Sequence, residues 1–363
     1  MSDLFDPITV GNYTLKNRVF MAPLTRSRAD ENGVPKKIVA EYYGQRASAG
    51  LIIAEATAIS QQTMGWLNAP GIFTDEQQAS WANIADAVHA EDGRIFVQIW
   101  HMGGAVHPDF VNGDQPVSSS SVKLTGAMST PKGPDKDLVE PRPLSKPEIK
   151  AIVQDFVGAA RRAVDAGLDG VEIHAANGFL LDQFIRDGVN QRDDEYGGTI
   201  ENRMRFMVEV IEAVVAEIGS GKVGIRLSPT NKFWGISDTT PSETFGKVVE
   251  KLNEYNLAYV HLLEPLPGTN HFIETIGFLT PEIRAKYTGT LLVNGGYDKE
   301  TGNAAIENGE ADAVVYGANF IANPDLVARY KLDAELAAAD QSRFYTEGAE
   351  GYSDYPALAV EYA

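Results

Sequence analysis

Cysteine is absent from this chain of 363 residues. Without thiols the protein cannot form disulfides, thiolate metal sites or a cysteine nucleophile. The absence of disulfides suits a reducing cytoplasm, which is the location we expect. The six histidines are scattered, and His101 and His107 lack the spacing of metal ligands, so we expect no metal site.

Positive charge and long apolar runs are also scarce. Lys and Arg number 31 against 50 Asp and Glu, a net charge of −19, and such a chain should repel nucleic acid and anionic lipid. No apolar run approaches the about 18 residues of a membrane span. Asp3, Asp6 and Pro7 interrupt the start of the chain, which therefore does not resemble a signal peptide. With a hydrophobic content of 44%, we expect a soluble globular protein that binds neither nucleic acid nor membrane.

Eight short apolar segments alternate with helical patterns along the chain. Alternation of this kind is typical of parallel strands, and eight units in a chain of this length predict a closed barrel. We therefore expect an α/β fold, a single (β/α)8 TIM barrel whose one domain covers residues 1–363. The expected strands are 18–21, 51–55, 94–100, 170–173, 223–227, 259–263, 291–293 and 313–316. The expected helices are 37–48, 75–91, 145–166, 179–186, 201–218, 242–255, 281–287, 299–308 and 325–330.

Two segments stand outside this alternation. Residues 8–10 and 13–15 flank Gly11-Asn12, which predicts a β-hairpin at one end of the barrel. Residues 101–145, after the third strand, are rich in Pro, Gly and Ser and predict a long irregular lid. Ser145 with Glu148 then forms the capping box of the next helix.

Polar residues gather at the carboxyl ends of the predicted strands, where barrels of this kind do their chemistry. His174 and Asn177 lie three residues apart where the fourth strand ends, and both can donate a hydrogen bond to one small oxygen. A single histidine at a strand end is more often packed or solvated than catalytic. The choice between these two interpretations therefore depends on which residues lie at the other strand ends.

Glycines close the last two strands, and two long polar side chains lie in apolar strands. Gly295, Gly296 and Gly317 each precede a helix, which is typical of a phosphate site. Gln98 and Arg226 either pair with each other or bind a ligand. In the second case Gln98 would hydrogen-bond a ring edge that has both donors and acceptors, and Arg226 would balance negative charge near a ring nitrogen. These demands match flavin mononucleotide (FMN).

Seven motifs that span nearly the whole chain then resemble one family, the Old Yellow Enzyme family of flavin-dependent ene-reductases. They are NRVFMAPLTR (17–26), VQIWH (97–101), EIHAANG (172–178), DEYGGTIENR (194–203), NGGY (294–297), IANPDL (321–326) and GYSDYP (351–356). Any one of these motifs alone is weak, but seven in order are specific.

The resemblance assigns a role to each position. It implies that His174 and Asn177 grip the substrate oxygen and that the Thr25 hydroxyl bonds flavin O4 and takes part in catalysis. Gln98 falls on the glutamine at the flavin pyrimidine edge, and Arg226 falls on the arginine beside N1 and O2. The other implied cofactor contacts are Pro23, Leu24, Ala56, Gly295, Gly296, Gly317 and Ala318. The implied aromatic substrate contacts are Trp66, Trp100, Phe179 and Tyr345.

Two positions depart from the family pattern. Ala318 stands where an arginine usually binds the flavin phosphate. Phe179 stands where a tyrosine usually donates a proton, so another proton source is needed.

The resemblance implies an enzyme in which NADPH or NADH reduces bound FMN. Hydride from flavin N5 then reduces the C=C bond of a small α,β-unsaturated carbonyl or nitro compound. We expect a monomer or homodimer. Two alternatives stay open: a flavin-free barrel aldolase or isomerase acting on a phosphorylated substrate, and a ligand-binding barrel without catalysis.

Overall fold

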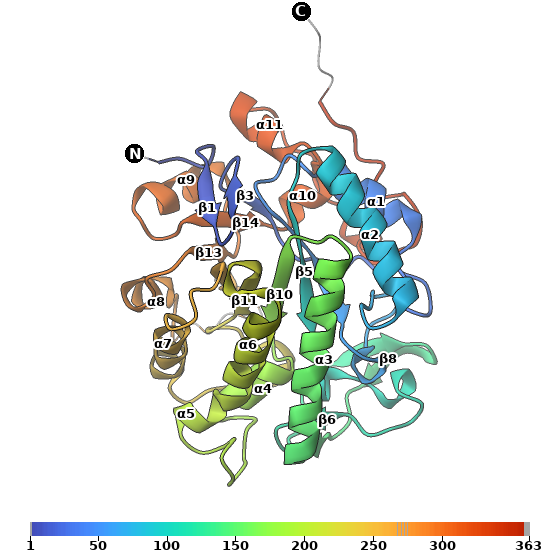
Figure 1. The fold of residues 1–363 in the computed structure, drawn as a ribbon, viewed down its shortest axis with the longest axis vertical. Coiled ribbons are helices and arrows are strands. Elements are labelled where there is room, and N and C mark those ends of the chain that lie inside the picture. Colours follow the sequence, from blue (N-terminus) through green and yellow to red (C-terminus); the bar gives the residue numbers. More distant parts are fainter. Residues whose placement is uncertain (1, 267, 270, 272, 274, 359–363) are drawn as a thin grey trace, which may run out of the picture.

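A computed structural model describes residues 2–266, 268–269, 271, 273 and 275–358. In this part of the chain, parallel strands close into a barrel in the order β10-β11-β12-β13-β14-β3-β4-β5 (Figure 1). The strands are β3 (Val19–Met21), β4 (Ile52–Ala58), β5 (Ile95–Trp100), β10 (Gly170–His174), β11 (Val223–Leu227), β12 (Tyr259–Leu263), β13 (Leu291–Asn294) and β14 (Ala313–Tyr316). The predicted (β/α)8 barrel is therefore confirmed.

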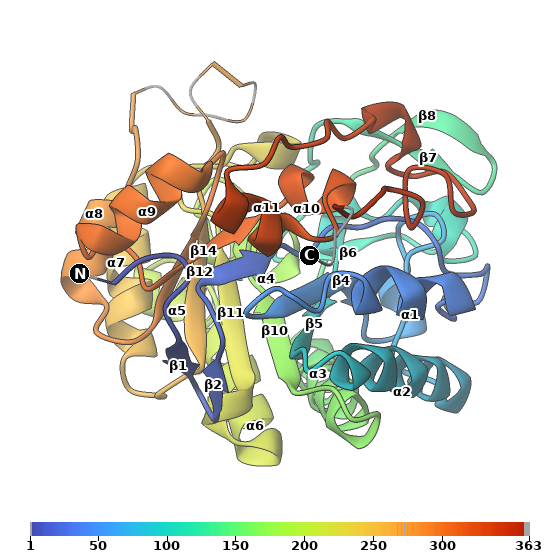
Figure 2. The same ribbon diagram turned by 90° about the horizontal axis from the view of Figure 1, so that it is seen from above.

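Helices surround the barrel on the outside (Figures 1 and 2). They are α1 (Lys37–Gly44), α2 (Asp75–Ala90), α3 (Lys146–Asp165), α4 (Leu180–Ile185), α5 (Ile200–Arg203), α6 (Arg205–Ile218), α7 (Pro241–Leu252), α8 (Thr280–Lys286), α9 (Lys299–Glu307), α10 (Ala318–Ala322) and α11 (Leu326–Leu332). The predicted capping box at Ser145 and Glu148 begins α3. The structure departs from the predicted helices in several places: α1 and α7 end earlier, the helix over 201–218 divides into α5 and α6, and α10 was not predicted.

Alternation along each strand divides its side chains between the helices and the barrel interior. On β10, Val171 and Ile173 belong to the core that the helices share with the barrel, whereas Glu172 and His174 point the other way. A lower interior layer is apolar and includes Phe20, Ile53 and Phe96. The interior is therefore apolar toward the amino ends of the strands and polar toward their carboxyl ends.

The predicted hairpin closes the apolar end. β1 (Ile8–Val10) pairs antiparallel with β2 (Tyr13–Leu15), and the hairpin's apolar residues join the lower interior layer. Gly11 at the turn has φ +53°, and a Cβ there would lie 2.0 Å from the carbonyl oxygen of Gly221. The turn therefore requires glycine.

The segment 101–145 is more ordered than we expected. It contains a parallel pair, β6 (Val117–Ser118) with β9 (Arg142–Pro143), and an antiparallel hairpin, β7 (Ala127–Thr130) with β8 (Gly133–Asp137). The prediction of an irregular lid was wrong on this point, because β8 is almost entirely polar and the pairs are too short for alternation to reveal them. Its buried residues, such as Met102, Val106 and Leu138, pack in one apolar cluster with Trp100 and Phe179. We call residues 101–145 the covering segment.

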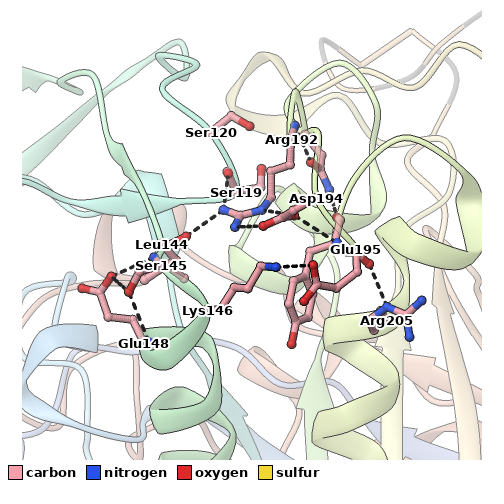
Figure 3. A network of polar contacts seen from close by, with 12 residues as sticks. Ser119, Ser120, Leu144, Ser145, Lys146, Glu148, Arg192, Asp194, Glu195 and Arg205 are labelled. Atoms are coloured by element: carbon pink, nitrogen blue, oxygen red, sulfur yellow. Dashed lines mark hydrogen bonds and ion pairs between the residues drawn. The ribbon is translucent and has the colours of Figure 1, made fainter.

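Arg192 anchors the base of this covering segment (Figure 3). One guanidinium nitrogen donates to the carbonyl oxygens of Ser119, at 3.1 Å, and Leu144, at 2.7 Å. The others donate to both carboxylate oxygens of Asp194, at 3.0 and 2.6 Å. The hydroxyl oxygen of Ser120 also accepts the backbone N–H of Gln191 at 2.8 Å. The covering segment is therefore fixed to the loop that follows β10 and α4.

Buried arginines hold the C-terminal segment against the barrel. The Arg26 guanidinium donates to the carbonyls of Phe344, at 3.1 Å, and Gly351, at 2.7 Å. Arg28 donates to the carbonyl of Phe344 at 2.9 Å. Because Arg26 directly follows Thr25, this contact also places Tyr345 near the carboxyl ends of the strands.

Candidate active site

His174 and Asn177 lie on one tight turn at the end of β10. Asn177 has φ +57°, a left-handed conformation that asparagine tolerates better than most residues. Its backbone N–H donates to the Ser228 hydroxyl at 2.7 Å. The next residue, Gly178, has φ +73°, and a Cβ there would lie 3.0 Å from the Phe233 carbonyl oxygen. The turn is thus held against the loop after β11.

Burial favours the neutral form of His174, which can donate one hydrogen bond. Its side chain is 3% exposed, and burial lowers its pKa well below the usual value, with a further contribution from Arg226. The backbone N–H of Ala176 donates to Nδ1 at 3.3 Å. A nitrogen that accepts carries no proton, so the proton is on Nε2. His174 can therefore stabilise an anionic oxygen without carrying a charge itself.

The side chain of Asn177 can supply a second donor. Its Oδ1 accepts a hydrogen bond from Nδ2 of Asn231 at 2.8 Å. This contact occupies the carbonyl end of the Asn177 amide and leaves its Nδ2 to donate. Both asparagines line a cavity of about 390 Å³ together with Phe179, Gly295 and Gly296. The structure therefore brings Asn177 and the predicted phosphate-site glycines onto one cavity.

The predicted aromatic residues form two groups. Phe179 packs edge-on against both His174 and Trp100, with ring centroids 4.8 Å apart in each case. Trp66 and Tyr345 contact each other with centroids 5.6 Å apart, and Tyr345 is 56% exposed. The first group fixes the imidazole ring from the side, and the second comes from separate parts of the chain.

Gln98 and Arg226 do not pair with each other, although the sequence allowed it. Gln98 Nε2 donates to Glu172 Oε1 at 2.7 Å. Arg226 donates to Asn294 Oδ1 at 2.8 Å. Burial lowers the pKa of Arg226, a shift that the charge of Glu172 opposes. Each long polar side chain thus has one protein partner and keeps further capacity for a ligand.

No site role was predicted from the sequence for three residues of this interior layer. Glu172 and His261 are fully buried, with Oε2 2.8 Å from Nδ1, and Asn294 donates from Nδ2 to the Val315 carbonyl at 2.7 Å. No role was predicted for Glu172, which lies inside the predicted strand 170–173. Its two-residue spacing from His174 was the signal, because that spacing puts both on the inner face.

The remaining predicted cofactor residues lie around β3, β4, β13 and β14. Pro23, Leu24 and Thr25 follow β3, and Ala56 lies in β4 beside the irregularity between Ala54 and Thr57. Gly295 and Gly296 have φ +140° and +80°, and a Cβ on Gly295 would lie 1.9 Å from the Glu264 carbonyl oxygen. Gly317 precedes α10, close enough to Leu24 that a Cβ would lie 3.5 Å from Leu24 Cδ2. Ala318 is exposed.

Two further searches cover the described residues alone. Within those residues no group of three or more His, Asp or Glu side chains is arranged to hold a metal ion. No helix there is both long and apolar enough to cross a membrane.

Known proteins match this chain over most of its length. Residues 3–336 match the model of the NADH:flavin oxidoreductase / NADH oxidase family. The chain is 45% identical to 12-oxophytodienoate reductase 1 of Oryza sativa subsp. japonica over 359 residues, covering 98% of this chain and 93% of the relative. It is 43% identical to 12-oxophytodienoate reductase 2 of Arabidopsis thaliana over 362 residues, covering 98% and 96%.

Solved structures are similar to this chain over nearly its whole length. The old yellow enzyme homologue from Zymomonas mobilis superposes with a TM-score of 0.96 at 45% identity, covering 98% of this chain and 100% of that one. Morphinone reductase in complex with tetrahydroNAD superposes with a TM-score of 0.93 at 42% identity, covering 100% and 99%.

Proposed function

Because the chain belongs to the NADH:flavin oxidoreductase / NADH oxidase family, we propose that it reduces the C=C bond of α,β-unsaturated carbonyl or nitro compounds. With this membership the motif resemblance to the Old Yellow Enzyme family is confirmed. The protein is an oxidoreductase that takes FMN as its flavin and a nicotinamide as its reductant. The substrate class, the choice between NADH and NADPH, the roles of individual residues and a cytoplasmic location belong to the proposal.

One observation carries the proposal: His174 and Asn177 offer two neutral donors at one strand end. Reduction of an activated C=C bond places negative charge on the carbonyl or nitro oxygen as hydride reaches the β-carbon. Two donors that are already oriented stabilise this charge, each by about 2.7–4 kcal/mol at sites of this kind. Neutral donors also release the product oxygen more easily than a cation would.

Gln98 and Arg226 of the barrel interior and the glycines at the strand ends suit FMN. Arg226 Nε is buried and has no hydrogen-bond partner among the described residues, so the guanidinium keeps an unused donor. Gln98 keeps its Oε1 as an acceptor, because its Nε2 donates to Glu172. Gln98 and Arg226 would hold the pyrimidine edge, and the backbone at Gly295, Gly296 and Gly317 would hold the phosphate. When bound, FMN supplies the hydride.

Protonation of the α-carbon needs another donor, because Phe179 has none. We assign this step to water from the cavity that Phe179 and Asn177 line. Phe179, which is 6% exposed, then acts as an apolar wall that shapes the substrate site.

No observation favours an aldolase or isomerase. Such an enzyme needs a free basic residue at a strand end. Glu172 is bound by both Gln98 and His261, and Glu55 accepts hydrogen bonds from the backbone N–H of Arg26 and from Tyr43. Neither carboxylate is available to a substrate.

The test begins with the purified protein, which should absorb near ~450 nm as bound flavin does. Under anaerobic conditions NADH and NADPH are each added, and bleaching of this band reports reduction. Cyclic enones and nitroalkenes are then added to the reduced protein. Return of the band with stoichiometric saturated product supports the proposal. A reduced protein that reacts with oxygen but with none of these compounds would refute the proposed substrate class.

A further inference from the structure

We propose that Asn231 is a positioning residue that determines which end of the Asn177 amide faces the substrate. The inference rests on the proposed function, because it concerns a donor of the proposed oxyanion site. Asn231 lies 54 residues further along the chain than Asn177, in the loop after β11. None of the seven sequence motifs includes it.

The need for such a residue follows from the shape of an amide. The C=O and NH₂ ends of an asparagine side chain are nearly equal in size, so packing alone selects neither orientation. With NH₂ toward the cavity, Asn177 stabilises a negatively charged oxygen. With C=O toward the cavity, it repels the same oxygen. The catalytic value of Asn177 therefore depends on what its other end meets.

A fixed donor starts the chain of contacts that sets this orientation. The backbone N–H of Phe233 donates to Oδ1 of Asn231 at 2.8 Å. A backbone N–H can only donate, so it fixes Oδ1 of Asn231 on this side. The NH₂ group of Asn231 then points to Asn177, where Nδ2 and Oδ1 are 2.8 Å apart. Since Asn231 can only donate there, Asn177 must turn its oxygen to Asn231 and its NH₂ group to the cavity.

The surroundings keep both amides in place. Asn231 is 5% exposed, so bulk water does not compete strongly for its hydrogen bonds. The hydroxyl of Ser228, three residues earlier in the same loop, accepts the backbone N–H of Asn177. One loop therefore fixes the backbone of Asn177 through Ser228 and the direction of its side-chain amide through Asn231.

Asn231→Asp tests the inference with almost no change in volume. Aspartate still accepts the Phe233 N–H, but its second oxygen can only accept as well. The Asn177 amide then turns its NH₂ group toward residue 231 and its C=O toward the cavity. Phenol binding to the FMN-loaded protein, measured by calorimetry, reports how well the site holds an oxygen. We expect at least a tenfold weaker affinity.

The new negative charge could weaken phenol binding by itself, so the same substitution is made in an Asn177→Ala background. If Asn231 acts through the Asn177 amide, Asn231→Asp weakens phenol binding by less than about threefold in that background, as a double-mutant cycle requires. Equal weakening in both backgrounds, or none in the wild-type background, overturns the inference. Flavin content and melting temperature are measured for each variant, and neither should differ between the two Asn231→Asp proteins and their parents.

Asn231→Ala serves as the second variant if Asn231→Asp does not fold. It removes the orienting contact without adding charge, and its smaller loss of phenol affinity should likewise vanish in the Asn177→Ala background. Failure of this inference is distinguishable from failure of the proposed function. If Asn177→Ala alone leaves phenol binding and flavin reoxidation unchanged, the proposed oxyanion site fails and the inference falls with it. If Asn177→Ala is impaired and the Asn231 variants are normal, only the inference fails.

Discussion

The carboxylate of Glu172 bridges Gln98 and His261 inside the barrel, with Oε1 2.7 Å from Gln98 Nε2 and Oε2 2.8 Å from His261 Nδ1. Burial lowers the pKa of His261, a shift that the Glu172 charge opposes. One buried acidic residue thus orients a side chain on each of two other strands. Because Nε2 of Gln98 donates to Glu172, Oε1 of Gln98 is left for the contact with flavin that we propose.

Glu172→Gln should therefore weaken FMN binding. The NH₂ group of the new glutamine faces either Gln98, from which it cannot accept, or His261 Nδ1, which must then give up its proton. In both cases Gln98 loses its hydrogen bond to a charged acceptor and is held less firmly. A buried hydrogen bond to a charged group is worth about 1.5–3 kcal/mol, which predicts at least a tenfold larger FMN dissociation constant. Fluorescence titration of the apoprotein measures it.

Asp169→Asn is a matched control for that substitution. Asp169 is also a buried carboxylate, but it bonds His89 and the backbone N–H of Ile95 at the other end of the barrel. The Asp169→Asn variant should have a lower melting temperature, and its FMN dissociation constant should stay within about twofold of the wild-type value. A Glu172→Gln protein with normal FMN affinity would contradict the positioning role.

His174→Ala and Asn177→Ala should each slow flavin reoxidation by enones about 10²-fold or more, because each removes one oxyanion donor. Stopped-flow absorbance after anaerobic reduction measures this step alone. His107→Ala, a histidine of the covering segment whose Nδ1 accepts the Asp109 N–H, provides the control. Wild-type rates in both strand-end variants would count against the oxyanion assignment.

Much of the architecture could be predicted from the sequence, since it depends on local patterns. The eight strands follow from apolar periodicity, and the start of α3 follows from Ser145 and Glu148. Contacts that depend on barrel closure could not be predicted in this way. Asn231 contacts Asn177 across 54 residues of sequence, and only the strand register places Glu172 opposite Gln98. The hairpin of β7 and β8 escaped prediction because its polar residues do not alternate with apolar ones.

Ala318→Arg should bind FMN more tightly than the wild type. Ala318 is exposed at the start of α10, so the longer side chain has room to reach a phosphate. The gain should shrink as salt rises, since salt screens an exposed ion pair. FMN dissociation constants at low and high salt measure it, with Ala318→Gln as a control for length without charge. Equal constants for Ala318→Arg and wild type would mean that the phosphate already has a cationic partner.

Phe179→Tyr should change substrate preference more than it raises the overall rate, because we assign Phe179 a steric role and proton delivery to water. Rates for a panel of enones and nitroalkenes, compared by kcat/KM, measure this. A uniform gain of about 10²-fold or more across all enones, with unchanged selectivity, would instead show that the wild type lacks an effective proton source.

Glu55 should make the folded protein less stable as pH rises. Burial raises the pKa of Glu55 from 4.5 to about 7. The folded state therefore keeps this proton at pH values where the unfolded chain loses it, and stability falls between pH 4.5 and about 7. The shift corresponds to about 3 kcal/mol.

Denaturant unfolding of wild type and Glu55→Gln on both sides of that pH window isolates the effect, since other groups cancel in the comparison. Glu148→Gln gives a control of opposite sign below that window. The hydrogen bond with Arg142 lowers the pKa of Glu148 from 4.5 to about 2, so its contribution to stability is lost as the pH falls through that range. If the stability curves of the wild type and the Glu55→Gln variant run parallel across the window, the carboxyl does not titrate there.

The anchoring of the covering segment by Arg192 has a consequence for how the substrate site can be remodelled. The guanidinium holds Ser119 and Leu144, which lie on either side of the hairpin of β7 and β8 along the chain. Residues between these two points can be exchanged as a cassette whose ends keep their separation, while the barrel beneath keeps its flavin and oxyanion residues. Chimeras with relatives should therefore be joined at these two residues, inside the clamp rather than at the ends of the neighbouring strand and helix.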